Sequence, residues 1–139
     1  MPQTAVSRAD LEKIICDVRS GDLLVQIAEQ LGKELYRSLK EAAPIRAIYD
    51  EAHLIGSLFH SDPETAIRRI HLLKPKMAYR AARNRKVKPL SEVLSQAVDV
   101  VVQGSNPQEI RGRFAQFLEF FEAIVAYHAG SRWEGEIGG

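Results

Sequence analysis

The sequence is poor in cysteine, with Cys16 as the only one among 139 residues. A single cysteine can neither form an intrachain disulfide nor supply a metal site built from several cysteines. Cys16 follows Ile14 and Ile15 in an apolar helical pattern, so we expect its thiol to be buried and unreactive. The absence of disulfides is typical of a reducing compartment, and we expect a cytoplasmic protein.

The sequence also has no hydrophobic run long enough to cross a bilayer, so we expect no membrane contact. Its first residues, MPQTAVSRADLEK, lack the apolar centre of a signal peptide. Hydrophobic residues make up 45% and charged residues 27%, which argues for a globular protein and against a disordered chain. We expect a single helical domain over residues 1–139, with loose ends at 1–6 and 131–139.

Strand alternation and hairpin turns are absent, and apolar residues instead recur at helical spacing along almost the whole chain. Ser7, Asp62 and Asn106 each precede such a segment, where their side chains can cap a helix. Pro44 and Pro89 suit the first turn of a helix. These signals predict an all-α fold, a compact bundle of about five to six helices.

Three features inside the helices are expected to shape the bundle. Proline inside a helix costs about 3 kcal/mol, so Pro75 predicts a break between residues 63–73 and a basic helix from 76 to about 85. Gly32 interrupts an apolar stripe and predicts a close contact between helices. The last helix, residues 108–128, is long and apolar almost all round, which predicts a central position or a shared interface.

Catalytic motifs are missing: there is no Gly-rich phosphate loop, no HExxH and no GxSxG. Asp50 and His53 have the spacing of a metal-ligand pair on a helix, but a two-metal bundle needs a second such motif. His128 lies near the expected end of the last helix at Gly130, where the helix dipole favours a cation. We predict that the chain is not an enzyme and holds no metal or cofactor.

Acidic residues are missing from one long interval, because none occurs between Glu64 and Glu92. The same interval contains nine Lys and Arg residues, whereas the rest of the chain has 10 of them against 18 Asp and Glu. We call residues 68–88 the basic segment. Its cations are Arg68, Arg69, Lys74, Lys76, Arg80, Arg83, Arg85, Lys86 and Lys88. A positive field gathered in this way attracts phosphates.

Helical spacing divides the second half of the basic segment into two faces. The polar face consists of Lys76, Tyr79, Arg80, Arg83 and Lys86, and the opposite face of Met77, Ala78, Ala81 and Ala82. Small apolar residues allow close packing against a neighbour, while the cations can follow a sugar–phosphate backbone and Tyr79 can stack on a base or sugar. The alternative is an ordinary solvated face, although such faces usually mix both signs of charge.

Four stretches of the chain carry a resemblance to a known family. They are QIAEQLGKEL (26–35), PIRAIYDEA (44–52), HLLKPKMAYRAARN (71–84) and FAQFLEFFEAIVAYHAGS (114–131). In this order they resemble the small helical subunit of the type III-A CRISPR (Csm) effector complex. The chain departs from the family pattern in the lead Glu41-Ala42-Ala43-Pro44, where Ser and Thr are usual, and at Ala129, where Lys is common.

The resemblance implies an antiviral-defence subunit that is all-α and not an enzyme. Several copies would line the channel that holds guide RNA and target RNA, beside repeated backbone subunits and the large subunit. Contacts should go to sugar and phosphate, since base pairing carries the sequence specificity. Matched to the family motifs, the RNA-binding residues would be Arg46, Lys74, Lys76, Tyr79, Arg80, Arg83, Arg85 and Lys86. Phe117, Phe121 and Tyr127 would belong to the core or to a subunit interface.

Two other hypotheses remain open from the residues. A helical DNA-binding regulator would place a basic helix in the major groove, and the expected break at Pro75 ahead of such a helix is compatible with it. A metal-dependent helical bundle would be built around Asp50 and His53.

Overall fold

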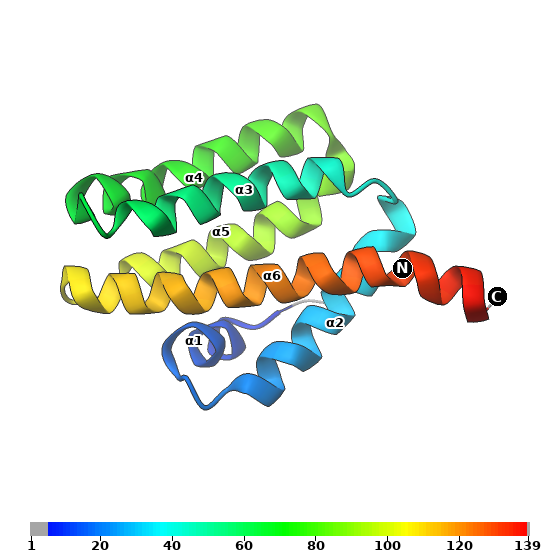
Figure 1. Cartoon of the computed structure of the whole chain (residues 1–139), viewed down its shortest axis with the longest axis horizontal. Helices are drawn as coiled ribbons and strands as arrows, with labels where there is room; N and C mark the ends of the chain where they lie inside the picture. Colours follow the sequence, from blue (N-terminus) through cyan, green and yellow to red (C-terminus); the bar gives the residue numbers. More distant parts are fainter. Residues whose placement is uncertain (1–5, 139) are drawn as a thin grey trace.

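The computed structural model describes residues 6–138 of the chain, with side chains described for residues 6–133. These residues form six α-helices and a short 3-10 turn and contain no strand (Figure 1). The elements are α1 (Arg8–Cys16), α2 (Gly21–Ser38), α3 (Ala43–Leu58), α4 (Pro63–Arg83), η1 (Arg85–Val87), α5 (Lys88–Val102) and α6 (Pro107–Gly138). The predicted all-α bundle is confirmed. No helix in the described part of the chain is long and apolar enough to cross a membrane.

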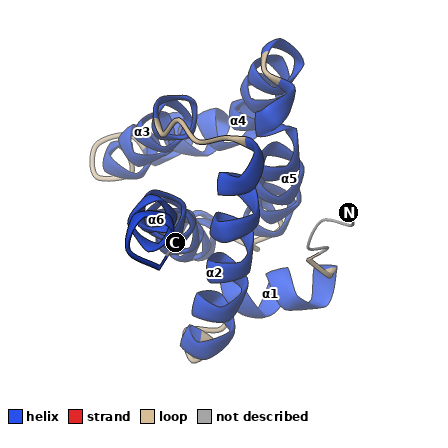
Figure 2. Cartoon of the chain, turned by 90° about the vertical axis from the view of Figure 1, so that its right-hand side faces the viewer, coloured by secondary structure: helices blue, strands red, loops and turns tan. Residues whose placement is uncertain are grey.

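Helix α6 is the centre of the bundle and contacts all five other α-helices. Figure 1 shows α3 and α4 on one side of α6 and α1 and α2 on the other, and Figure 2 gives the view along the helix. The α6 aromatic residues fill the core: the rings of Phe114 and Phe117 stack 5.3 Å apart, and Phe117 meets Phe121 edge-on at 6.1 Å. Aromatic side chains bury much apolar area each, so this column dominates the core.

The expectation that α6 is apolar almost all round is not confirmed. Arg111, Glu119 and Glu122 are exposed along the helix, so it keeps an outer polar stripe. Its end was also misplaced, because α6 continues through Gly130 to Gly138. No described glycine adopts a positive φ, so Gly130 does not take the left-handed conformation that ends many helices.

Residues 131–138, which we expected to be loose, therefore continue α6, while residues 1–5 and Gly139 lie outside the described part. For the same reason His128 is not at a helix end. It is buried, and its Nε2 donates a hydrogen bond of 2.6 Å to the carbonyl oxygen of Leu39, the residue that caps the C-terminus of α2. The histidine satisfies a carbonyl left without a partner in α2, which replaces the dipole explanation.

The predicted break at Pro75 does not occur, because α4 is one helix from Pro63 to Arg83. Pro75 cannot donate to the carbonyl of His71, but both residues are exposed, so water can bind that carbonyl. Ile70, Leu73 and Met77 on either side are buried in the core. Burying such side chains stabilises by about 1.5–3 kcal/mol each, which exceeds the local cost of the proline.

The predicted helix starts are confirmed. Ser7 accepts a hydrogen bond from the backbone N–H of Asp10 at 3.0 Å. Asn106 accepts one from the N–H of Glu109 at 2.9 Å, and the Glu109 carboxylate in turn accepts the N–H of Ser105 at 3.0 Å. Pro44, Pro63 and Pro89 each occupy the first turn of a helix. These local interactions set where the helices begin.

Asp62 caps α4, and we expect its carboxylate to make the stability of the fold depend on pH. The Thr65 hydroxyl donates to its Oδ2 at 2.6 Å and the Thr65 N–H to its Oδ1 at 3.1 Å, and these bonds lower the pKa of the carboxyl. A lowered pKa stabilises the fold above the unfolded-state pKa, and the stabilisation is lost as pH falls through the folded-state pKa.

Asp62→Asn keeps a capping side chain but cannot titrate, so we expect urea denaturation from pH 7 down to pH ~3 to show a smaller loss of stability for the variant. Parallel curves for both proteins would contradict this.

The predicted close contact at Gly32 is confirmed. A Cβ atom placed there would lie 2.7 Å from the Cβ of Tyr127 and 2.8 Å from the backbone nitrogen of His128. The backbones of α2 and α6 therefore touch at this point, and only glycine fits between them.

The burial expected for Cys16 is wrong. The residue ends α1 and is exposed. Partial desolvation nevertheless raises the pKa of its thiol, opposed by the nearby charge of Arg113, so the protonated and less reactive form is favoured.

Candidate nucleic-acid interface

The basic segment occupies α4 from its second turn to its end, the turn η1 and the first residue of α5. The end of α4, η1 and the start of α5 lie at the same end of the bundle as the start of α3, the right-hand end in Figure 1. Helix α4 ends at Arg83, two residues earlier than expected, since Asn84 leaves the helix and its side chain accepts the N–H of Lys86 at 3.2 Å. Lys86 therefore lies in η1 and not on the cationic face of α4.

Tyr79, Arg80 and Arg83 form the arginine–tyrosine cluster. Together with Pro44, Asn84 and Val87 they line a shallow cleft between α4 and the start of α3. The Arg83 Nη1 donates to the Tyr79 hydroxyl at 3.2 Å, and the guanidinium carbon lies 5.7 Å from the centre of the ring. Tyr79 is 62% exposed. The cluster thus presents an oriented cation beside a solvent-exposed aromatic ring.

Arg46 lies at the same end of the bundle as this cluster but does not line its cleft. It is exposed in the first turn of α3, two residues after Pro44, which lines the same cleft. Among the side chains that the structure describes, no carboxylate lies within 4.0 Å of Arg46, Arg80 or Arg83. Their charges are therefore available to an external anion.

Lys74 and Lys76 are placed differently. The Lys74 Nζ lies 2.6 Å from an Oδ1 of Asp99 on α5, and Lys76 pairs with Glu51 on α3. Two cations of the basic segment, which has no acidic residue of its own, thus pair with carboxylates on neighbouring helices. Both lysines tie α4 to another helix, and their charge is partly neutralised, so they are weaker candidates for phosphate contact than the arginines.

The small-residue face of α4 is only half covered. Met77 and Ala81 are buried, as expected, but Ala78 and Ala82 are exposed because α5 covers only one narrow stripe of the helix. The uncovered residues line a groove between α4 and α5, which also contains Arg85, Lys88, Ser91, Glu92, Ser95 and Gln96. Arg85 thus faces a different groove from the arginine–tyrosine cluster.

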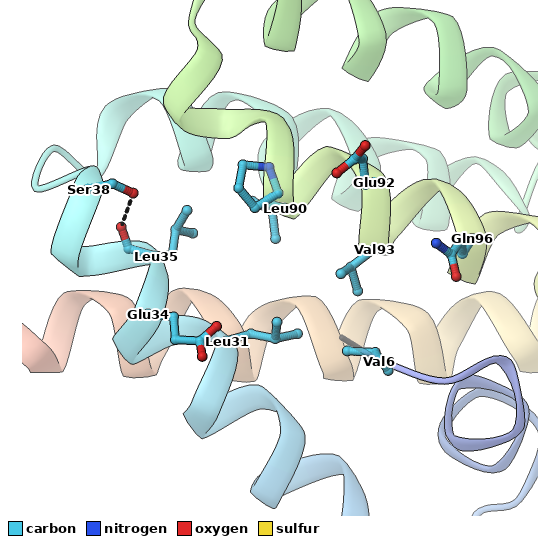
Figure 3. Close-up of a pocket in the computed structure, with 10 residues that line it drawn as sticks. Val6, Leu31, Glu34, Leu35, Ser38, Leu90, Glu92, Val93 and Gln96 are labelled. Atoms are coloured by element: carbon cyan, nitrogen blue, oxygen red, sulfur yellow. Dashed lines mark hydrogen bonds between the residues drawn. The ribbon is translucent and has the colours of Figure 1, made fainter. Parts of the chain in front are cut away.

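A further cleft between α2 and α5 shares Glu92 and Gln96 with the groove between α4 and α5 (Figure 3). Leu31, Leu35 and Val93 line it, and its charged residues are Glu34 and Glu92. Carboxylates repel phosphate, so this cleft does not suit a nucleic-acid backbone.

A family model described as Csm2 Type III-A matches residues 19–132 of the chain. The chain belongs to this family. It is therefore a small subunit of the type III-A CRISPR effector, the Csm complex. No curated protein matches the chain, and no solved structure matches it.

The matched residues of this Csm subunit include the arginine–tyrosine cluster and the aromatic core. Phe117 and Phe121 are fully buried within the chain. Tyr127 is half-buried against Gly32 of α2.

The candidate metal pair of the Csm subunit gains no partner. Asp50 and His53 are exposed on α3, and the His53 ring lies 5.9 Å from that of Tyr49. Among the described side chains, no group of three or more His, Cys, Asp or Glu residues is placed to hold a metal ion.

The sequence reasoning missed two further cation–aromatic pairs. Lys40 lies over the ring of Tyr36, with Nζ 4.3 Å from its centre, and Arg132 lies 5.7 Å from the centre of the Trp133 ring. Helical spacing could not have predicted the pair of Tyr36 and Lys40, because Lys40 lies beyond the end of α2 at Ser38. We had expected the second pair to lie in a loose tail.

Proposed function

We propose that this Csm subunit binds the RNA backbone within the effector complex through the arginine–tyrosine cluster and Arg46, and that it is not itself a catalyst. The observation that carries the proposal is the placement of two arginines without carboxylate partners beside an exposed tyrosine, with Arg46 at the same end of a bundle that belongs to an RNA-guided complex. Arginine binds phosphate through a planar fork of donors, which suits this role.

The ligand that fits best is the sugar–phosphate backbone of the guide RNA paired with its target RNA. In an RNA-guided complex, base pairing selects the target, so the protein gains nothing from reading base edges. Tyr79 adds a ring that can pack against a sugar, and Arg80, Arg83 and Arg46 supply charge. Lys74, Lys76, Arg85 and Lys86 remain secondary candidates, because they are ion-paired or lie outside the cluster.

We further propose that the subunit packs against copies of itself, the repeated backbone subunits and the large subunit. Family membership supports this, and large apolar residues such as Val18 and Leu54 are exposed on the surface. No observation favours the DNA-binding regulator, because the basic cluster lies at the C-terminal end of a 21-residue helix without the expected break.

The test is RNA binding by the double variant Arg80→Ala/Arg83→Ala. Each lost phosphate contact should lower the slope of log affinity against log salt by about 0.7–0.9, so the variant should lose roughly 1.4–1.8. At about 0.1 M salt this corresponds to an affinity roughly 25- to 60-fold weaker. Anisotropy of a labelled RNA duplex between about 50 and 200 mM salt measures both quantities.

Two controls sharpen this experiment. Arg8→Ala/Lys13→Ala removes the same charge from exposed residues of α1, on the other side of α6, and should leave the slope almost unchanged. Lys74→Ala/Lys76→Ala should change it less than the arginine pair, because both lysines already have carboxylate partners. Equal slopes for the arginine variant and the wild type would assign the RNA to another surface. A wild-type chain that binds no RNA, alone or in the reconstituted complex, would contradict the proposed function.

A further inference from the structure

A second cleft at the same end of the molecule lies between the end of α2 and the last turns of α6. Its lining residues are Tyr36, Lys40, Glu41, Ala42, His128, Ala129, Arg132 and Trp133. Among the described side chains, the rings of Tyr36 and Trp133, the cations Lys40 and Arg132 and the carboxylate of Glu41 thus line one cleft. The family match ends at Arg132, one residue before the tryptophan.

Trp133 is the exposed ring of this cleft. Its side chain lies on the surface with 59% of its area exposed, and Arg132 is 5.7 Å from the ring centre. Exposing a tryptophan to water is unfavourable unless another molecule covers it, and a large ring beside cations is the element on which single-stranded nucleic acids stack. Lys40 over Tyr36 adds a second cation that is held in place by its contact with a ring.

Another part of the cleft is held by contacts between α2 and α6. The buried His128 donates to the carbonyl of Leu39, and its ring meets that of Tyr36 edge-on at 5.4 Å. These contacts hold the end of α2 against α6, and with it the position of Lys40. A binding surface held in place before the ligand arrives loses less entropy on binding.

The cleft also lies near the cleft of the arginine–tyrosine cluster. Ala42 lines the second cleft and Pro44 lines the first, and two residues of chain span at most about 7 Å. Figure 1 shows the connection from α2 to α3 passing between the start of α3 and the last turns of α6. The two clefts are therefore close enough at one end of the molecule for one nucleic-acid ligand to reach both.

We propose that this second cleft binds an unpaired nucleotide of RNA, with a base stacked on Trp133 and the adjoining phosphates bound by Lys40 and Arg132. The ligand is single-stranded, because the bases of a duplex are stacked on one another and present no free face. The inference rests on the proposed function and deepens it: the arginine–tyrosine cluster holds paired RNA, and the Trp133 cleft holds a strand where pairing ends.

Trp133 is the only tryptophan in the chain, so its fluorescence reports on this cleft alone. The full chain is titrated with a labelled single-stranded RNA and, in parallel, with the same strand annealed to its complement. RNA anisotropy measures binding, and tryptophan emission measures stacking. We expect the single strand to quench the emission with the same midpoint as the anisotropy change, and the duplex to bind with little quenching.

Variants complete the test. Trp133→Ala should weaken single-strand binding about 5- to 100-fold, and Trp133→Phe should restore most of it, since phenylalanine also stacks. Leu54→Ala, which removes another exposed apolar side chain far along the chain, should change nothing. Arg80→Ala/Arg83→Ala should weaken duplex binding while the single strand still quenches Trp133.

The outcomes separate the two proposals. RNA binding without a change in Trp133 emission would overturn this inference and leave the backbone-binding function intact. Equal quenching by duplex and single strand would overturn the assignment to unpaired RNA. Absence of binding by either RNA, both to the chain alone and in the reconstituted complex, would overturn both proposals.

Discussion

Replacement of Phe117 by alanine is expected to lower the free energy of unfolding by about 3–5 kcal/mol. The side chain has no exposed area, stacks on Phe114 and meets Phe121 edge-on. Its removal leaves a cavity beside α6, a helix that contacts the other five α-helices. The rigid aromatic neighbours cannot move to fill this cavity. Since small proteins are stable by only about 5–15 kcal/mol, much of the total would be lost.

Thermal unfolding followed by circular dichroism measures this effect, with an expected fall in Tm of roughly 10–20 °C. Leu54→Ala is the matched control, because it also truncates a large apolar side chain but one that is 71% exposed. That change should stay within about 0.5 kcal/mol. A Phe117 variant as stable as the Leu54 variant would show that the aromatic column is not packed as described.

Gly32→Ala is expected to destabilise the protein even though alanine is the better helix former. The added methyl carbon would lie less than 3.0 Å from the Tyr127 Cβ and from backbone atoms of α6. Neither the Cβ nor the backbone can move away unless the whole helix shifts. Such overpacking costs about 1–3 kcal/mol. This cost outweighs the gain in helix propensity on replacing glycine by alanine, which is at most about 1 kcal/mol.

Gly112→Ala should change the stability in the opposite direction. Gly112 also lies inside a helix, but nothing lies within 4 Å of a Cβ placed there, so the variant should be more stable by about 0.4–1 kcal/mol. Urea denaturation of the two variants beside the wild type measures both changes. Stabilisation at both positions would mean that α2 and α6 do not approach as closely as the structure shows.

Local signals in the sequence predicted most of the fold because helix starts depend on neighbours within one turn. Ser7, Asp62 and Asn106 accept hydrogen bonds from residues three positions ahead, and each was recognisable from that spacing alone. The continuity of α4 through Pro75 was not predictable in this way, because it depends on which neighbouring side chains are buried and which carbonyl is hydrated.

The candidate site was predicted in outline and corrected in detail. The gap in acidic residues located the positive surface, and Tyr79, Arg80 and Arg83 do line one cleft. Lys76 was grouped with them by helical spacing, yet it pairs with Glu51, 25 positions away. Spacing along one helix shows which residues share a face, but it cannot show which acids a second helix brings to that face.

The sequence by itself determined the helical class, the helix starts and the concentration of positive charge, because each depends on composition or on residues a few positions apart. Family membership also followed from the order of its motifs. Tertiary structure alone decided which cations stay unpaired, why His128 is buried and how Trp133 joins Tyr36 and Lys40 in a cleft. The physical reason is distance along the chain: His128 and Leu39 are 89 residues apart, and only packing of α2 on α6 brings such groups together.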